Sequence, residues 1–155
     1  MARLAAAAAE PEQPGSLFLA IDQVGAETLG HALFTANAFD EAAMAVERIY
    51  TSDNRAYPVG GRKPKRDTAW GRHVLVERRV YVGEGEDAIR QAFADHELIL
   101  SLGLRAVVNV PVVFAARCLG TLNFLWRSPT VPPRDVAVAR LLALTAVPAF
   151  VLKPG

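Results

Sequence analysis

This sequence contains few cysteines and histidines, and neither basic nor acidic residues are in clear excess. It has one cysteine, so no disulfide can form within the chain and no cysteine cluster can hold structural zinc. Its three histidines, His31, His73 and His96, show no recognisable metal-ligand spacing. Seventeen basic and sixteen acidic residues give a net charge of +1, which argues against nucleic acid as the main partner. These shortages predict a cytoplasmic protein without a metal centre.

Long apolar runs are missing as well. No run reaches the roughly 18 residues that a membrane-spanning helix needs, and the longest candidate, residues 141–152, contains Pro148. The alanine run near the N-terminus leads directly into the charged and proline residues 10–12, without the longer apolar core of a secretory signal. We therefore expect no membrane association, and we expect residues 1–15 to be a disordered or loosely helical lead-in.

The chain does contain enough apolar sequence for one folded domain. Hydrophobic residues make up 52% of its 155 residues and charged residues 21%, which is typical of a globular protein. A chain of this length can bury a core large enough to fold independently. We expect a single domain over residues 16–152.

The stretch at residues 105–126 predicts a β-hairpin, with the sequence RAVVNVPVVFAARCLGTLNFLW. Both halves are apolar and rich in β-branched residues, and residues 115–117 turn the chain. Alternation along a strand places Asn109 on one face of the first strand, and Thr121 and Asn123 on one face of the second. If these faces coincide, two amides and a hydroxyl lie in an apolar wall, which suits a ligand-binding surface.

Helical spacing, strand alternation and breaker residues define the other elements. The expected order is a helix at 16–28, strands at 31–39 and 43–51, an irregular loop at 52–66, a helix at 67–78, a strand at 80–82, helical turns at 87–93 and 95–102, the hairpin, and a last helix at 132–151. Because most strand pairs are hairpins, this order predicts an α+β fold around an antiparallel sheet. The first and last helices should cover one face, and the middle segments should enclose a pocket on the other.

Two details of the helices carry further expectations. Asp95 stands where it can cap the helix that follows it. The last helix should kink or end at Pro148. Its apolar stripe is expected to consist of Val136, Leu141, Leu144 and Val147.

The sequence resembles the GAF domain family, whose members are small-molecule sensor modules related in architecture to PAS domains. The resemblance covers about residues 16–152, as a stand-alone single GAF domain. It is strongest at residues 100–111, LSLGLRAVVNVP, and 117–125, RCLGTLNFL, where Gly120 takes the family's usual glycine position. It implies a central sheet of five or six strands, terminal helices on one face, a ligand cavity on the other, and frequent homodimerisation through the terminal helices.

The chain departs from the GAF subfamilies that have a defining motif. Cyclic-nucleotide-binding members carry a dispersed Asn-Lys, Phe and Asp-Glu motif, whereas residues 37–41, NAFDE, are contiguous and lack the lysine. Bilin-binding members attach their chromophore through a cysteine followed by histidine, but Cys118 is followed by Leu119. Members that reduce free methionine sulfoxide use several cysteines in the middle of the chain, where this sequence has none. Haem-binding members use one axial histidine. His73 or His96 could serve in principle, but no neighbouring sequence feature supports haem binding at either residue.

Seven side chains are candidates for ligand contact. They lie on the expected pocket strands, beside the loop or on the helix after it: Tyr50, Tyr57, Trp70, His73, Asn109, Thr121 and Asn123. Each has a plainer reading, since the asparagines could bond to backbone, Trp70 could belong to the core and His73 could be solvated or capped. The run of two glycines and four basic residues at 60–66 could offer amides and cations to an anion, but a solvated loop is the default expectation.

The sequence thus predicts a non-catalytic small-molecule sensor that acts in signalling or regulation, with its ligand between the sheet and residues 67–102. The identity of the ligand and of any cofactor stays open. Because the chain carries no kinase, cyclase or DNA-binding segment, its output should pass to a separate effector protein or through dimer geometry. Two alternatives are a small redox enzyme built on Cys118 and a dimeric protein-interaction module without ligand.

Overall fold

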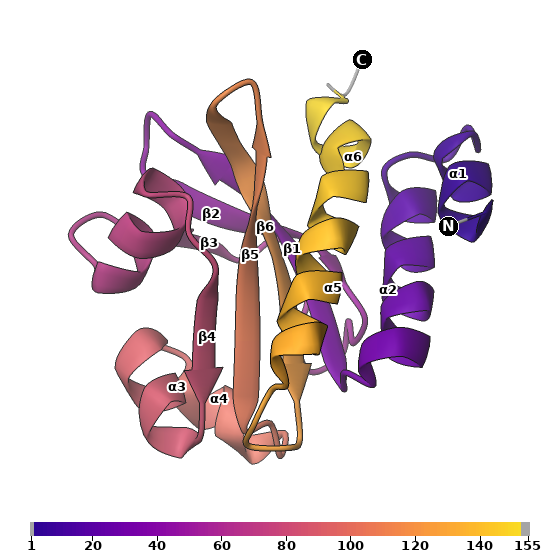
Figure 1. The fold of residues 1–155 in the computed structure, drawn as a ribbon. Helices are drawn as coiled ribbons and strands as arrows, with labels where there is room; N and C mark the ends of the chain where they lie inside the picture. The colour runs from indigo at the N-terminus through magenta and orange to yellow at the C-terminus, as the bar shows by residue number, and fades with distance from the viewer. Residues whose placement is uncertain (1, 153–155) are drawn as a thin grey trace.

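A six-stranded antiparallel sheet forms the centre of the molecule (Figure 1). The computed structural model describes residues 2–152. The strands are β1 (Leu33–Asp40), β2 (Ala45–Thr51), β3 (Arg62–Pro64), β4 (Tyr81–Glu84), β5 (Ala106–Phe114) and β6 (Arg117–Trp126), in the spatial order β3-β2-β1-β6-β5-β4. Every neighbouring pair is antiparallel. The predicted α+β class and the predicted strand number are therefore confirmed.

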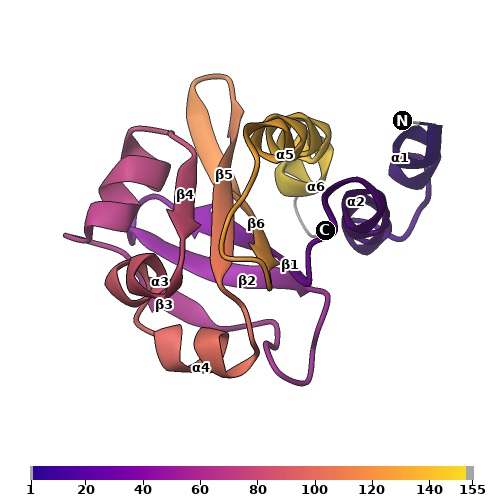
Figure 2. The same ribbon diagram turned by 60° about the horizontal axis from the view of Figure 1, so that its bottom comes forward.

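Helices lie on both faces of this sheet, as Figure 2 shows. They are α1 (Ala2–Ala8), α2 (Gly15–Leu29), the π-helix η1 (Gly71–Val76), α3 (Glu86–Ala92), α4 (His96–Ser101), α5 (Pro133–Thr145) and α6 (Val147–Val151). The N- and C-terminal helices cover one face, and η1, α3 and α4 lie over the other. This is the predicted layering. No helix within residues 2–152 has both the length and the apolar character needed to cross a membrane.

The expected elements differ from the observed ones mainly at the two ends and in the loop. The lead-in contains helix α1, whose Leu4 is buried in the core beside α2. The last helix is divided at Ala146 into α5 and α6, just before Pro148, which lacks an amide donor for a continuing helix. Strand β3 lies inside the expected irregular loop. Its three residues are too few to predict a strand from the sequence, and it forms because it pairs with β2.

The core under the terminal helices is built around stacked aromatic rings. Phe34 of β1 and Phe124 of β6 lie with ring centroids 5.0 Å apart, and Phe18 of α2 is fully buried in the same cluster. Trp126 closes the end of this core by donating its indole N–H to the carbonyl of Leu29, at 2.9 Å. Burial of these large rings holds α2 and α5 against the sheet.

The predicted apolar stripe of the last helix is confirmed in part, since Val136 and Val147 pack against the core but Leu141 and Leu144 do not. Ala139, Leu142, Ala143 and Ala146 face the core, whereas Leu141 and Leu144 are 63% and 67% exposed. Both stripes have helical spacing, so the periodicity of an alanine- and leucine-rich helix fits either face. The face with the alanines is the buried one because their small side chains let the helix lie close to the strands.

A β-bulge in β2 changes the face on which Tyr50 lies. Ala36 pairs with Tyr50 but Asn37 pairs with Arg48, so Ile49 is the extra residue. Tyr50 therefore packs against Phe18 on the helix-covered face, with ring centroids 5.6 Å apart. The expected placement of Tyr50 among the residues of the pocket is corrected accordingly.

The packing of α5 predicts opposite effects for two neighbouring leucines. Leu142→Ala should lower the free energy of unfolding by about 2–5 kcal/mol, because it leaves a cavity in the core. Leu141→Ala should change it by no more than about 0.5 kcal/mol, because that side chain is exposed. Urea denaturation followed by circular dichroism measures both values. Equal losses for the two variants would show that the orientation of α5 is wrong.

Candidate functional site

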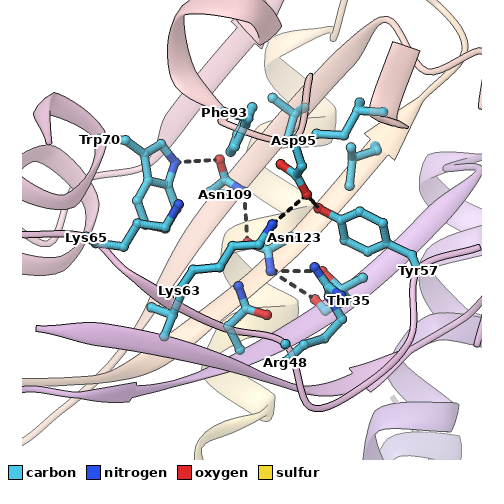
Figure 3. A pocket seen from close by; sticks show the side chains of 16 residues that line it. Thr35, Arg48, Tyr57, Lys63, Lys65, Trp70, Phe93, Asp95, Asn109 and Asn123 are labelled. Atoms are coloured by element: carbon cyan, nitrogen blue, oxygen red, sulfur yellow. Dashed lines mark hydrogen bonds and ion pairs between the residues drawn. The ribbon is translucent and has the colours of Figure 1, made fainter. Parts of the chain in front are cut away.

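A small internal cavity lies between the sheet and the segments that cover its second face (Figure 3). Its volume is about 50 Å³, and its wall comes from β1, β2, β5 and β6. Residues of the loop after β2, of β3 and of the region from η1 to α4 close it. The cavity thus occupies the position between the sheet and residues 67–102 where the sequence predicted the ligand.

A chain of four hydrogen-bonded polar side chains crosses the wall of the cavity. Trp70 donates its indole N–H to Oδ1 of Asn109 at 2.9 Å. Asn109 donates through Nδ2 to Oδ1 of Asn123 at 2.8 Å, and Asn123 donates through Nδ2 to Oγ1 of Thr35 at 3.0 Å. The last three residues are direct cross-strand neighbours on β5, β6 and β1, so the expectation that the two asparagine faces coincide is confirmed. We call these four residues the polar ladder.

Three cationic side chains and one carboxylate line the mouth of the cavity. Lys63 donates from Nζ to Oδ2 of Asp95 at 2.6 Å, and the hydroxyl of Tyr57 donates to the same oxygen. The guanidinium carbon of Arg48 lies 3.6 Å from the centre of the Tyr57 ring. Lys65 places its Nζ 5.0 Å from the Trp70 ring. Figure 3 shows these side chains around the cavity, with Tyr57 on the loop after β2 and Lys63 on the edge strand β3. Three cations and one carboxylate among the described lining residues give the mouth an excess of positive charge.

Close backbone approach holds Lys65 beside the ladder. A Cβ at Gly71, the first residue of η1, would lie 2.5 Å from the carbonyl oxygen of Lys65. Only glycine therefore lets η1 pack this tightly against the segment after β3. The consequence is that Lys65 and Trp70 form adjacent parts of the same wall.

The environment changes the acidity of the groups at the mouth. Burial works to raise the pKa of Asp95, but hydrogen bonds from Lys63 and Tyr57 outweigh it and hold that pKa below its usual range. Burial raises the pKa of Tyr57, and the charge of Asp95 raises it further. Burial lowers the pKa of Lys65, with a smaller contribution from Lys63. Asp95 is therefore ionised and Tyr57 is protonated at neutral pH, in keeping with the hydrogen bond between them.

Two buried polar atoms that border the cavity have no hydrogen-bond partner among the described residues. They are Nε of Arg48 and Oδ1 of Asn37. The Nη1 atom of Arg48 donates to the carbonyl of Pro58 at 2.6 Å, but no carboxylate within residues 2–152 is paired with this guanidinium. Since buried polar groups are nearly always hydrogen-bonded, these two atoms mark a place for a polar ligand or water.

Four of the seven predicted ligand residues line the cavity, and three do not. Tyr57, Trp70, Asn109 and Asn123 are in its wall. His73 instead donates from Nε2 to the carbonyl of Val80 at 2.8 Å and borders an open groove outside the cavity. Thr121 is fully buried between Asn37 and Pro111 and does not reach the cavity wall. Tyr50 lies on the opposite face of the sheet, so the predicted placement of these three residues is corrected.

Sequence reasoning missed the charged half of the site. Lys63 and Lys65 belong to the run expected to be a solvated loop, yet pairing of β3 with β2 sets Lys63 opposite Val46 on the cavity face. Asp95 was expected to cap α4, but it makes no capping hydrogen bond and points to Lys63 instead. Thr35 and Asn37 could have been found, because alternation along the strand at 31–39 places both on one face.

Cys118 and the histidines give no support to redox or haem chemistry. Burial raises the pKa of the Cys118 thiol to about 11, so the thiol is protonated at neutral pH and is a poor nucleophile. His96 donates from Nδ1 to the carbonyl of Phe93 at 2.9 Å. Within residues 2–152, no group of three or more His, Cys, Asp or Glu side chains is arranged to hold a metal ion.

The polar ladder predicts a large cost for the loss of one amide. Asn109→Ala leaves the indole N–H of Trp70 and Oδ1 of Asn123 buried without partners, and should lower the free energy of unfolding by about 2–4 kcal/mol. Asn54→Ala, on the exposed loop, is the matched control and should change it by less than about 0.5 kcal/mol. Chemical denaturation measures both, and an equal effect would contradict the role of the ladder.

The comparisons with known proteins concern the fold. No protein-family model matches this sequence, and the curated proteins contain no match to it. A solved methyl-accepting chemotaxis protein, residues 122 to 287, is similar with a TM-score of 0.72 and 17% identity, covering 97% of this chain and 93% of that one. The GAF domain of a two-component sensor histidine kinase from Bacillus halodurans has a TM-score of 0.62 and 12% identity, covering 81% and 90%.

A third similar structure is the GAF domain from an Acinetobacter phosphoenolpyruvate-protein phosphotransferase. Its TM-score is 0.68 at 13% identity, and the match covers 96% of this chain and 90% of that domain. At such identities the likeness is one of architecture: a six-stranded antiparallel sheet with terminal helices on one face and shorter segments on the other. This architecture is the one that the sequence resemblance implied. The chain therefore has the GAF-domain fold.

Proposed function

We propose that this chain is a sensor domain that binds a small molecule in the cavity between the sheet and residues 67–102. The observation that carries the proposal is the pair of buried, unpartnered polar atoms on Arg48 and Asn37 beside the cavity. Ligand sites are mainly apolar, with a few fixed polar groups that orient the ligand. The polar ladder, set among Val46, Val107 and Leu125, has this character.

The volume of the cavity restricts what can bind without rearrangement. About 50 Å³ holds on the order of a few water molecules or one small group, whereas sites for drug-sized ligands reach about 300–1,000 Å³. The sheet wall is held by long strand pairs, but β3 pairs with β2 at three positions only. A larger ligand would therefore be admitted by movement of β3 and of the Tyr57 loop.

Binding rather than catalysis fits the side chains that are present. The described residues that line the cavity include no histidine, cysteine or serine, and their one carboxylate, Asp95, is already paired with Lys63. These lining residues therefore include no serine or cysteine nucleophile with a histidine base beside it. We propose that the domain acts in signalling or regulation, as the names of the similar chemotaxis and sensor-kinase proteins suggest for them, and that its output passes to an effector protein or a dimer partner.

Native mass spectrometry of the freshly purified full chain tests this function. The expected result is a small molecule bound at one copy per chain in the parent protein and absent from Val107→Phe, because the larger ring fills the cavity. Val108→Phe is the matched control, since it overpacks the core on the other face by the same volume and should keep the ligand.

Two results would contradict the proposed function. One is a ligand that Val107→Phe and Val108→Phe retain equally. The other is an unliganded mass together with no shift in melting temperature for any member of a broad metabolite panel. Circular dichroism confirms that both variants are folded before they are compared.

A specific observation also favours an interaction surface on the terminal helices. Leu141 and Leu144 of α5 and Leu19 of α2 are largely exposed although apolar. Exposed apolar groups on neighbouring helices are typical of protein contacts. We propose homodimerisation through this helical layer, as the GAF resemblance implied.

Light scattering coupled to size-exclusion chromatography tests the dimer. The full chain should be dimeric at high concentration, and the double variant Leu141→Glu, Leu144→Glu should be monomeric, because two carboxylates in the contact would have to be desolvated. Arg134→Glu, an exposed change at the start of α5, should stay dimeric. A monomeric wild-type chain at millimolar concentration would exclude the dimer.

A further inference from the structure

We infer that the ligand of this cavity carries a small oxyanion, a carboxylate or a phosphate group, and that Asp95 holds the place of this group on Lys63 and Tyr57 in the free protein. This inference rests on the proposed function, because it names the chemistry of the molecule bound at the same site. Three observations support it: the surplus of cations, the unpaired guanidinium of Arg48, and the position of the Asp95 carboxylate.

The surplus of cations is a property of the cavity and not of the whole chain. Arg48, Lys63 and Lys65 all line the cavity, and Asp95 is the one carboxylate among the described lining residues. The chain as a whole is nearly neutral, with a net charge of +1. Partly buried cations that lack counter-ions favour the entry of an anion, because the Coulomb attraction is less screened there than in water.

The guanidinium of Arg48 is the most buried of these cations. The residue is 9% exposed, and its partners are a backbone carbonyl and the face of the Tyr57 ring. Its Nε–H has no acceptor among the described residues. Arginine is almost never this buried unless it is paired, and its planar donors match an oxyanion better than any neutral ligand.

The carboxylate of Asp95 already shows how an oxyanion is held. A single oxygen, Oδ2, accepts from the ammonium of Lys63 and from the hydroxyl of Tyr57. These contacts join residues 32 and 38 positions apart, so they tie β3 and the Tyr57 loop to the start of α4. An incoming oxyanion replaces the Asp95 carboxylate on the same two donors, so Lys63 keeps an anionic partner.

Exchange at Asp95 supplies a route from binding to signalling. Asp95 is the N-cap residue of α4, but its side chain makes no capping hydrogen bond. Once displaced from Lys63 and Tyr57, this carboxylate can accept hydrogen bonds from the backbone N–H groups in the first turn of α4. Its departure releases the link between α4 and the Tyr57 loop. The ligand would then occupy the cation site, and the loop, β3 and α4 would move as the conformational signal.

Fluorescence of Trp70 in the full chain tests the inference. Trp126→Phe removes the other tryptophan, so that the emission reports only on the cavity wall. Inorganic phosphate and acetate are titrated separately at an ionic strength held constant with sodium chloride. Saturable binding is expected, and the anion with the lower Kd identifies the preferred group.

Three variants in the Trp126→Phe background separate the roles. Asp95→Asn should bind the preferred anion at least about tenfold more tightly, because the internal competitor is gone. Arg48→Gln should weaken binding at least about tenfold. Arg62→Gln makes the same change in charge beside Lys63 but breaks an exposed pair with Asp40, and should leave the Kd unchanged within about twofold. If Arg48→Gln does not fold, Lys63→Gln combined with Asp95→Asn replaces it and should lose the gain.

The inference is overturned if Asp95→Asn shows no saturable response to either anion, if it binds no more tightly than the parent, or if Arg48→Gln and Arg62→Gln have the same Kd. These failures are distinct from failure of the proposed function. A stoichiometric uncharged ligand in native mass spectrometry, lost in Val107→Phe, would keep the sensor and exclude the oxyanion. A matching response of the parent chain to sodium chloride alone would likewise overturn the inference.

Discussion

The hydrogen bonds of the polar ladder fix the register of the central strands and the position of the segment that covers them. Asn109 and Asn123 are buried amides, and each is satisfied only if β5, β6 and β1 pair in one register. A shift by one residue would turn both amides to the helix-covered face, among the aromatic rings of the core. The ladder also reaches η1 through Trp70, and so places the segment that covers the cavity.

The two halves of the cavity differ in how completely their polar groups are satisfied. The polar ladder in the sheet wall is a set of neutral hydrogen bonds that joins β5, β6 and β1, which makes this part of the wall rigid. The charged groups of the mouth come from β2, from β3 and the residue after it, and from the start of α4, and Arg48 has no counter-ion among the described residues. A rigid wall with an incompletely paired mouth is an arrangement that can bind and respond. The GAF fold alone does not specify this, because function resides in the site and not in the architecture.

Much of the fold could be predicted because it follows from local pattern. The β-branched runs on either side of residues 115–117 predicted the hairpin, and period-two alternation predicted that Asn109 and Asn123 face the same way. The same rule failed for Tyr50, because one bulged residue reverses a face and leaves no clear mark in the sequence. It also failed for α5, where alanine and leucine supply two apolar stripes and only packing selects between them.

The α+β class, the antiparallel sheet, the layering of helices and the polar wall of the cavity could all be predicted, because they follow from periodicity within short segments of the sequence. The contact of Lys63 with Asp95 and that of Arg48 with Tyr57 are known only from the folded structure. Those contacts arise when β3 pairs with the edge of β2 and when a distant helix closes over it. No local sequence pattern encodes these contacts, because each depends on how segments that are distant in the sequence are placed in the folded domain.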